Sequence, residues 1–216
     1  MRGQALQAVL FDWDGTLVNT AEASYRCYEK LFGSYGIAFD RDAFRRTYSP
    51  NWHLTYSALG LAEELWAEAD ARWLGHYCEE EVVLLEGARD ALLRVRDAGL
   101  RAGLVTSGDR VRVRRELADL GMAELFEVLV CAEDTVRRKP DPEPLLLALQ
   151  RMRLAPAEAV YVGDSPEDVQ MAQTAGVRTV GIPGGFPNRE ALAAARPDVL
   201  EETLATALDR VFEEVS

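Results

Sequence analysis

Two aspartates with one residue between them are the first candidates for chemistry. Asp12 and Asp14 follow the apolar segment 8–11, which has the composition of a buried strand. Side chains two positions apart leave an extended strand on the same side, so both carboxylates can reach one centre. Close carboxylates repel each other and stay ionised only near a cation, and hard oxygen ligands suit Mg²⁺. Taken alone, the pair is better explained by a tight turn at residues 14–15 with Asp12 facing water.

A second pair of aspartates strengthens the metal hypothesis. Asp164 follows the apolar segment 159–162 and could supply a third oxygen ligand. Without a metal, an acidic triad in a cleft would be strongly unfavourable. Asp168 has two interpretations, because Ser165 and Asp168 also form a capping box with Pro166 at the first helical position. A metal role for Asp168, direct or through water, therefore stays open beside a capping role.

Two hydroxyls and one ammonium complete the candidate set. Thr106 and Ser107 end another apolar segment and can donate hydrogen bonds to an anion at the start of the following helix. Their alternative role is to cap that helix. Lys139 stands out because the chain has only one other lysine, Lys30. A rigid turn at Pro140 would aim Lys139, although a solvated surface lysine is the ordinary alternative.

Strand and helix patterns alternate over most of the chain and predict the element order. Apolar strands that take turns with amphipathic helices are typical of a parallel sheet covered on both faces. The fold class is therefore α/β, a doubly wound, Rossmann-like parallel sheet, whose ligands bind beyond the carboxyl ends of the strands. The expected strands are 5–13, 100–106, 128–131, 159–162 and 178–181, and the expected helices are 88–97, 111–120, 142–152, 166–175 and a last one from 201.

A helical insertion interrupts this alternation after the first strand. Residues 39–78 show helical periodicity only, and a helix is also expected over 19–35. The first strand cannot be stable alone and must join the later sheet. The predicted division is a catalytic core of residues 1–17 and 87–216 with a helical cap of residues 18–86.

The motifs together resemble the haloacid dehalogenase superfamily of phosphatases, in its phosphoglycolate-phosphatase-like subgroup with a helical cap. Four motifs in order are highly specific, whereas any one alone would be weak. They are Phe11-Asp12-Trp13-Asp14-Gly15-Thr16-Leu17, Val105-Thr106-Ser107, Lys139-Pro140 and Gly163-Asp164-Ser165-x-x-Asp168.

The resemblance implies a role for each motif residue. Asp12 would be the nucleophile that forms an aspartyl phosphate, and Asp14 the acid and base. Thr106, Ser107 and Lys139 would bind the phosphate. Mg²⁺ would be the only cofactor, and its candidate ligands are Asp12, Asp14, Asp164 and Asp168. The implied reaction is the hydrolysis of a small-molecule phosphate monoester, with phosphoglycolate as the compound that the subgroup suggests.

Other functions remain as alternatives. Within the family, dehalogenases lack the acid that Asp14 supplies, phosphonatases use a cap lysine placed later than Lys30, and sugar-phosphate mutases carry a cap histidine where this chain has Ser24. A receiver-type phosphoacceptor domain also combines acidic residues, Mg²⁺, a hydroxyl and a lysine, but it is shorter and uncapped. A catalytically silent binding protein is disfavoured by the complete motif set.

The cap is expected to select the substrate. Candidate contacts gather around the turn 49–51, and those that we expect to bind substrate are Trp52, His53 and Arg45. The remaining candidates are Arg46, Tyr48 and Asn51. Their alternative roles are a solvated helix face and internal packing of the cap. Trp66, Trp73 and Tyr77 have the spacing of helix-packing residues. The segment 184–187 has the composition of a connecting loop, with a position at the border of the site as the alternative.

Charge and cysteine content restrict partners and location. The chain has 216 residues and a formal net charge of -12, which repels nucleic acid and anionic membranes. An anionic substrate, here a small phosphorylated metabolite, must then find positive charge inside its site. The first apolar run ends too early for a signal peptide, and three scattered cysteines without CxxC spacing predict a reduced, cytoplasmic protein. No sequence feature indicates the oligomeric state.

Overall fold

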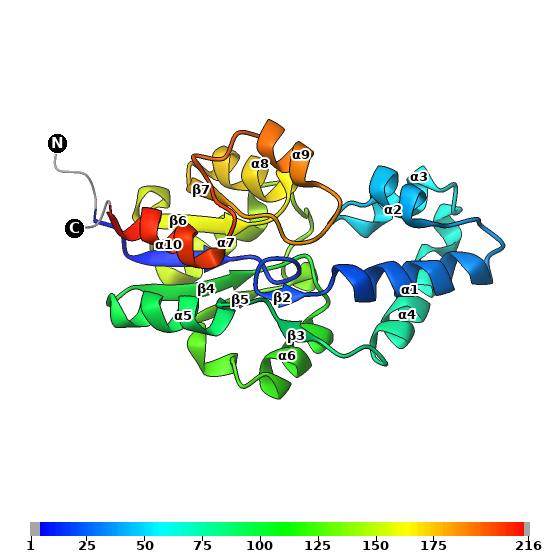
Figure 1. The fold of residues 1–216 in the computed structure, drawn as a ribbon, viewed down its shortest axis with the longest axis horizontal. Coiled ribbons are helices and arrows are strands. Elements are labelled where there is room, and N and C mark those ends of the chain that lie inside the picture. Colours follow the sequence, from blue (N-terminus) through cyan, green and yellow to red (C-terminus); the bar gives the residue numbers. More distant parts are fainter. Residues whose placement is uncertain (1–4, 214–216) are drawn as a thin grey trace.

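A parallel sheet of six strands with helices on both faces forms the centre of the protein (Figure 1). The structure is a computed structural model that describes residues 5–213. From one edge to the other, the sheet has the order β5-β4-β1-β6-β7-β8. Its strands are β1 (Ala8–Phe11), β4 (Arg101–Val105), β5 (Val128–Val130), β6 (Ala159–Gly163), β7 (Arg178–Gly181) and β8 (Val199–Leu200). The chain builds outward from β1 to β5 and then continues on the other side of β1, so the winding direction reverses there.

The central strand β1 is buried on both faces. All four of its residues are buried, and alternate side chains enter different cores. Val9 and Phe11 pack with residues of helices α5, α6 and α10, whereas Ala8 and Leu10 pack with residues of α7 and α8. A continuous apolar strand thus requires helices on both sides.

The helices fall into two groups. Those around the sheet are α5 (Ala88–Asp97), α6 (Arg110–Asp119), α7 (Glu143–Met152), α8 (Pro166–Ala175), α9 (Arg189–Ala194) and α10 (Leu204–Glu213). The others are α1 (Ala21–Ser34), α2 (Arg41–Thr47), α3 (Trp52–Ala58) and α4 (Trp66–Tyr77), with a 3₁₀ turn, η1 (Glu63–Leu65), before α4. Further 3₁₀ turns are η2 (Ala123–Leu125), η3 (Ala132–Asp134) and η4 (Pro156–Glu158). None of the helices in residues 5–213 has both the length and the apolar character to cross a membrane.

Helices α1 to α4 form a separate helical block (residues 21–77) beside the sheet (Figure 1). Its core is a cluster of aromatic side chains, among them Tyr28, Phe32 and Phe44. Two short antiparallel strands, β2 (Val18–Asn19) and β3 (Val83–Leu84), pair where the chain enters and leaves this block. Both connections between sheet and block are thereby held together.

The α/β class predicted from the sequence is confirmed, with local differences. The last helix begins at Leu204 and not at residue 201, because Glu201 still bonds Gly181 as an extension of β8 and the Thr203 hydroxyl accepts from the backbone of Thr206. Helix α9 and the β2–β3 pair were not predicted. Elements of two to six residues are too short to show a period.

Candidate active site

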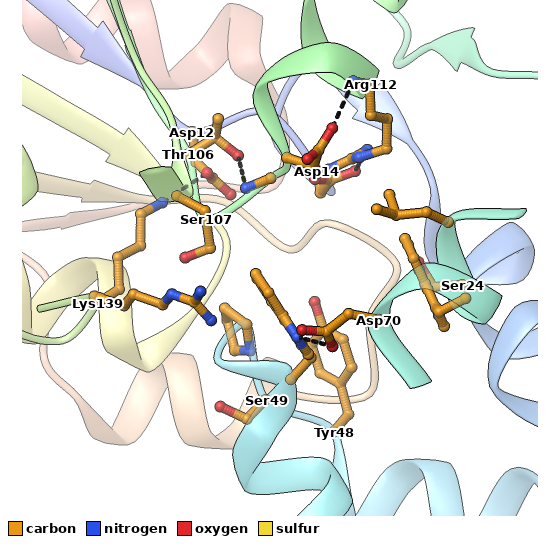
Figure 2. A pocket seen from close by; sticks show the side chains of 18 of the residues that line it. Asp12, Asp14, Ser24, Tyr48, Ser49, Asp70, Thr106, Ser107, Arg112 and Lys139 are labelled. Carbon is orange, nitrogen blue, oxygen red and sulfur yellow. Dashed lines mark hydrogen bonds and ion pairs between the residues drawn. The ribbon is translucent and has the colours of Figure 1, made fainter. Parts of the chain in front are cut away.

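Polar side chains from three strand ends meet at one edge of the sheet. Asp12 follows β1, Thr106 follows β4 and Asp164 follows β6, and all three are buried. Because β1 lies between β4 and β6, these three strand ends are neighbours. A cavity of about 270 Å³ lies in front of them, and residues of the helical block form its opposite wall (Figure 2). The strand order alone therefore assembles residues that are more than 150 positions apart in the chain.

Lys139 is buried between two carboxylates. Its Nζ donates to Asp12 Oδ1 at 2.6 Å and to Asp168 Oδ1 at 2.7 Å, and the residue is 2% exposed. Burial alone would lower the pKa of Lys139, but the charges of Asp12 and Asp168 outweigh burial and raise it. The ammonium therefore stays protonated beside Asp12, at the wall of the cavity.

Both carboxylate oxygens of Asp168 are engaged by the protein. Oδ1 accepts from Lys139 and, at 3.1 Å, from the hydroxyl of Tyr161. Oδ2 accepts from the backbone N and the Oγ of Ser165 at 3.1 and 2.7 Å, and Ser165 Oγ accepts in turn from the Asp168 backbone N. The capping box is thus formed, and it fixes Asp168 where it also anchors Lys139.

Asp164, by contrast, has an oxygen that no group satisfies. Its Oδ2 is buried and has no hydrogen-bond partner among residues 5–213. Gly15 and Gly184 lie against this oxygen so closely that an added Cβ would stand 2.2 and 2.3 Å from it. Gly15 also has a φ of +80°, which favours glycine. A side chain at either glycine would therefore collide with this oxygen of Asp164.

Three carboxylates form a group that fits a divalent cation. Asp12, Asp164 and Asp168 each place one oxygen within 4.8 Å of the others. Burial raises the pKa of Asp12 to about 7, with Lys139 opposing and Asp168 adding to the effect. Burial, followed by the charges of Asp12 and Asp168, also raises the pKa of Asp164 well above its usual range. Buried, clustered oxygen donors with an unsatisfied member suit Mg²⁺, whose charge would favour their ionised forms.

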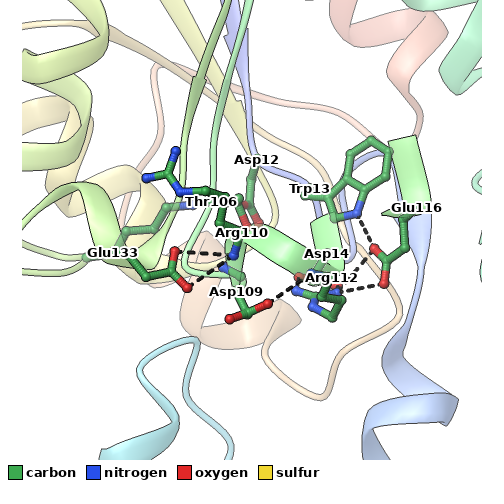
Figure 3. A network of polar contacts seen from close by, with 11 residues as sticks. Asp12, Trp13, Asp14, Thr106, Asp109, Arg110, Arg112, Glu116 and Glu133 are labelled. Atoms are coloured by element: carbon green, nitrogen blue, oxygen red, sulfur yellow. Dashed lines mark hydrogen bonds and ion pairs between the residues drawn. The ribbon is translucent and has the colours of Figure 1, made fainter. Parts of the chain in front are cut away.

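The side chain of Asp14 has a different partner (Figure 3). Arg112 Nη1 donates to Asp14 Oδ1 at 3.0 Å, and Nη2 donates to Oδ2 at 2.5 Å. Burial alone would raise the pKa of Asp14, but the charge and the hydrogen bonds of Arg112 outweigh burial and lower it. Asp14 is therefore an ionised, oriented carboxylate at the cavity wall, and its side chain is not part of the three-aspartate group.

A chain of polar contacts holds Arg112 in place (Figure 3). Its Nη1 also lies 3.3 Å from both oxygens of Glu116, and Trp13 Nε1 donates to Glu116 Oε2 at 2.6 Å. Gly108 approaches so closely that an added Cβ would lie 2.3 Å from Arg112 Nη2. Contacts of this kind fix the direction of the Asp14 carboxylate.

The helical block contributes aromatic side chains to the cavity. Trp52 lines it, and its Nε1 donates to Asp70 Oδ1 at 2.7 Å. Tyr48 also lines it and stacks on Phe186, with ring centroids 4.4 Å apart. Phe186 belongs to the segment 184–187, which therefore borders the cavity and is more than a connecting loop. Trp73, expected only to pack helices, is a further lining residue.

Two of the expected substrate contacts lie away from the cavity. His53 does not line it; its ring stacks on Trp66, and its Nε2 lies 3.2 Å from Asp70 Oδ2. Arg45 is exposed and pairs with Asp42 at 3.2 Å. The reason is the orientation of α2, whose buried face is taken by residues 43–44, so that Arg45 projects into solvent. Arg46 is likewise exposed.

Comparison with known proteins identifies the family. Residues 9–182 match the family described as Haloacid dehalogenase-like hydrolase, a segment that runs from β1 to just beyond β7. The chain belongs to this family. The resemblance found in the four motifs is thereby confirmed.

Two relatives of this hydrolase are named as phosphatases, and one solved neighbour holds phosphate. It is 32% identical over 212 residues to Pyrophosphatase PpaX of Bacillus pumilus, covering 96% of this chain and 97% of the relative. It is 37% identical over 132 residues to the phosphoglycolate phosphatase of Salmonella typhimurium, covering 61% and 52% of the two chains. CbbY of Rhodobacter sphaeroides, solved in complex with phosphate, has 26% identity and a TM-score of 0.79, covering 94% and 99%. The expectation of a phosphatase of this family is confirmed.

Several cavity residues of this hydrolase were not found from its sequence, among them Arg112, Asp70 and Arg138. Arg112 lies in a helix with four arginines, so its type gave no signal. Asp70 lies on α4 and meets Trp52 only because two helices pack together. Arg138 lines the cavity directly before Lys139, and its position next to a motif residue is the one signal that could have indicated it.

Proposed function

We propose that this hydrolase is a Mg²⁺-dependent phosphatase that cleaves a small-molecule phosphate monoester through an aspartyl phosphate on Asp12. The placement of Asp12 carries the proposal. Its carboxylate is hydrogen-bonded to Lys139 and lies close to Asp164, whose second oxygen has no partner within residues 5–213. A carboxylate that attacks a negatively charged phosphoryl group requires such positive charge and metal-ligating oxygens beside it.

The hydroxyls after β4 support phosphate binding. Ser107 Oγ is buried at the cavity and has no hydrogen-bond partner in the part of the chain that the structure describes. Thr106 Oγ1 accepts from the backbone N of Gly108 at 3.0 Å, which leaves its own proton free to be donated. Both hydroxyls can therefore donate to phosphoryl oxygens without losing an internal bond.

The proposed reaction has two displacements. Asp12 attacks phosphorus in line with the ester oxygen, so that a carboxylate O–P bond forms as the ester O–P bond breaks. Water then attacks the aspartyl phosphate and releases phosphate and Asp12. Lys139 offsets charge on the phosphoryl oxygens in both steps. When bound, Mg²⁺ supplies further positive charge, and Asp12 and Asp164 are the residues that would hold it, with Asp168 adjacent.

Asp14 is the acid and base in this proposal. It lies at the cavity wall, two residues after the nucleophile, and Arg112 sets its orientation. To act as the acid, Asp14 would first take up a proton from solvent, which requires one of its oxygens to leave Arg112; it would give this proton to the departing ester oxygen and take one from water in the second step. The same residue serves both steps, because the leaving alcohol and the attacking water occupy the same side of phosphorus.

The proposal includes the division into a core of residues 1–17 and 87–216 and a cap of residues 18–86. The cap would select a small phosphorylated metabolite, and the cavity of about 270 Å³ suits a substrate of this size. A net charge of -12 disfavours nucleic acid and membranes, and cytoplasmic residence remains part of the hypothesis. Ser24 lines the cavity where mutases of the resemblance carry a histidine, which favours hydrolysis over phosphoryl transfer within a sugar.

Phosphate release from a panel of phosphorylated compounds tests this function. We expect purified protein to hydrolyse at least one small ester, and we expect a chelator to remove the activity and added Mg²⁺ to restore it. Phosphoglycolate and pyrophosphate belong in the panel because of the relatives' names. Activity that survives complete metal removal would contradict the Mg²⁺ dependence, and no release from any ester would contradict the phosphatase proposal.

The contact between Arg112 and Asp14 yields a separate prediction. Arg112→Lys keeps one positive charge but loses the two parallel bonds to Asp14, so kcat for an alkyl phosphate should fall about 10- to 100-fold, as for a misplaced catalytic group. Arg114→Lys, on the exposed side of the same helix, is the control and should leave kcat unchanged. If Arg112→Lys retains the full kcat, the orientation of Asp14 does not depend on this pair.

A further inference from the structure

Arg138 lies between the end of the cavity that contains Asp12 and the helical block. It directly precedes Lys139, whose ammonium points to Asp12. The Arg138 side chain lines the same cavity, and its Cζ lies 4.1 Å from the ring centroid of Trp52 on α3. One short segment therefore carries two positive charges, one directed at the nucleophile and one directed at the wall where the rest of a substrate would lie.

Among residues 5–213, no acidic side chain forms an ion pair with Arg138. Its Nη1 is buried and has no hydrogen-bond partner within residues 5–213. The other basic residues of the cavity wall are committed: Lys139 to two carboxylates, and Arg112 to Asp14 and Glu116. Arg137, the preceding residue, is 69% exposed and pairs with acidic residues outside the cavity. Arg138 thus differs from its neighbours in having a guanidinium available to a ligand.

Two carboxylates of the cavity wall, Asp70 and Glu133, already have other partners. Asp70 accepts from Trp52 with one oxygen and contacts His53 with the other. Glu133 accepts from the backbone N of Arg110 at 3.1 and 3.2 Å with its two oxygens. The contact to Asp70 also fixes the Trp52 ring, so the surface on which Arg138 stacks is rigid. A guanidinium that is held in place and lacks an acceptor is suited to a planar anion.

We infer that Arg138 binds a second anionic group on the substrate, a carboxylate or a second phosphate carried by the leaving group. This inference rests on the proposed function, because it assumes that the first phosphate occupies the site at Asp12. The substrate class is then a phosphate monoester with a second negative charge within the reach of one small cavity. The relevant bonds are charge-assisted, and their loss should weaken binding of such a compound about 10- to 100-fold.

The test compares matched ligands as competitive inhibitors or substrates in p-nitrophenyl phosphate hydrolysis. 3-Phosphoglycerate carries a carboxylate where glycerol 3-phosphate carries a hydroxymethyl group, and propane-1,3-diyl bisphosphate tests a second phosphate against 3-hydroxypropyl phosphate. The wild type should bind at least one compound with a second anionic group 10-fold or more tightly than its partner that lacks this group. Arg138→Gln should remove this preference, and its kcat/KM for p-nitrophenyl phosphate, which has no second anionic group, should fall by a smaller factor than its affinity for the preferred compound.

Two further variants serve as controls. Arg137→Gln should keep the preference, because its side chain lies outside the cavity. Arg138→Lys should keep part of the preference, because lysine retains the positive charge but lacks the planar pair of N–H donors of arginine. The pair of charged compounds distinguishes a carboxylate site from a phosphate site.

The inference is overturned if the wild type does not discriminate between compounds with a second anionic group and their partners without it. It is also overturned if Arg138→Gln weakens all four compounds equally, which would assign Arg138 to the packing of Trp52 alone. Absence of p-nitrophenyl phosphate hydrolysis in the wild type would instead refute the proposed function, and the two failures are therefore distinguishable.

Discussion

Asp12→Asn is expected to lower kcat by at least about 10⁴-fold for every ester, because an amide cannot form the acyl phosphate that the reaction passes through. Stopped assays of phosphate release, with the wild type at matched concentration, measure this loss. The size of the loss distinguishes a nucleophile from a residue that only assists the reaction, because substitution of an assisting residue leaves a higher residual kcat.

The loss should not result from unfolding. Asp12 lies near two other buried carboxylates, and removal of one charge relieves repulsion among them. Lys139 keeps Asp168 as its partner. We therefore expect the thermal unfolding midpoint, measured by circular dichroism, to be no lower than that of the wild type. Asp97→Asn, at the exposed last residue of α5, is the control for the substitution itself. Substantial turnover by folded Asp12→Asn would remove Asp12 from the role of nucleophile.

Asp14→Asn is expected to slow phosphoenzyme formation more strongly for an ester with a poor leaving group than for one with a good leaving group. An alkyl alkoxide needs a proton as it departs, whereas p-nitrophenolate is stable without one. Formation of the phosphoenzyme from an alkyl phosphate should therefore slow by about 10²- to 10⁴-fold, the usual contribution of general acid catalysis. Formation from p-nitrophenyl phosphate should slow by less than about 10-fold. Single-turnover kinetics with the two esters measure the difference.

The structure sharpens this prediction for Asp14. Both of its oxygens face Arg112, so asparagine can replace only one of the two acceptors. A general loss of order around Arg112 would slow both esters alike. Equal slowing of the alkyl and nitrophenyl esters would thus contradict an acid role and would leave Asp14 as a partner of Arg112 only.

The sequence predicted the core of the candidate site because its signals are local. Asp12, Asp164 and Thr106 each stand at the end of an apolar strand, and parallel strands present these ends at one edge. Motif order then identified Lys139, whose position depends on contacts 127 and 29 residues away in the chain. The strand pattern was therefore sufficient to predict most of the fold and the side of the cavity that the strand ends form.

The cavity wall that the helical block forms depends on tertiary packing, which local sequence patterns do not reveal. Arg45 and His53 were expected there and lie elsewhere, since residue type and spacing do not reveal which face of α2 or α3 is buried. For the segment 184–187 a connecting loop was favoured over a position at the site, yet Phe186 stacks on Tyr48, 138 positions earlier in the chain. Arg112 reaches Asp14 across 98 positions. Such contacts follow from tertiary structure, which overrides local propensity.

The proposed function depends above all on a covalent bond between phosphorus and Asp12, and that bond can be observed directly. In Asp14→Asn, hydrolysis of the aspartyl phosphate should be slow while its formation from p-nitrophenyl phosphate remains fast. Rapid quenching in acid, proteolysis and mass spectrometry should then find one phosphoryl group on the peptide that contains Asp12, with a burst of p-nitrophenol equal to the amount of enzyme. A burst with the phosphoryl group on another residue, or steady turnover with no adduct and no burst, would contradict the account.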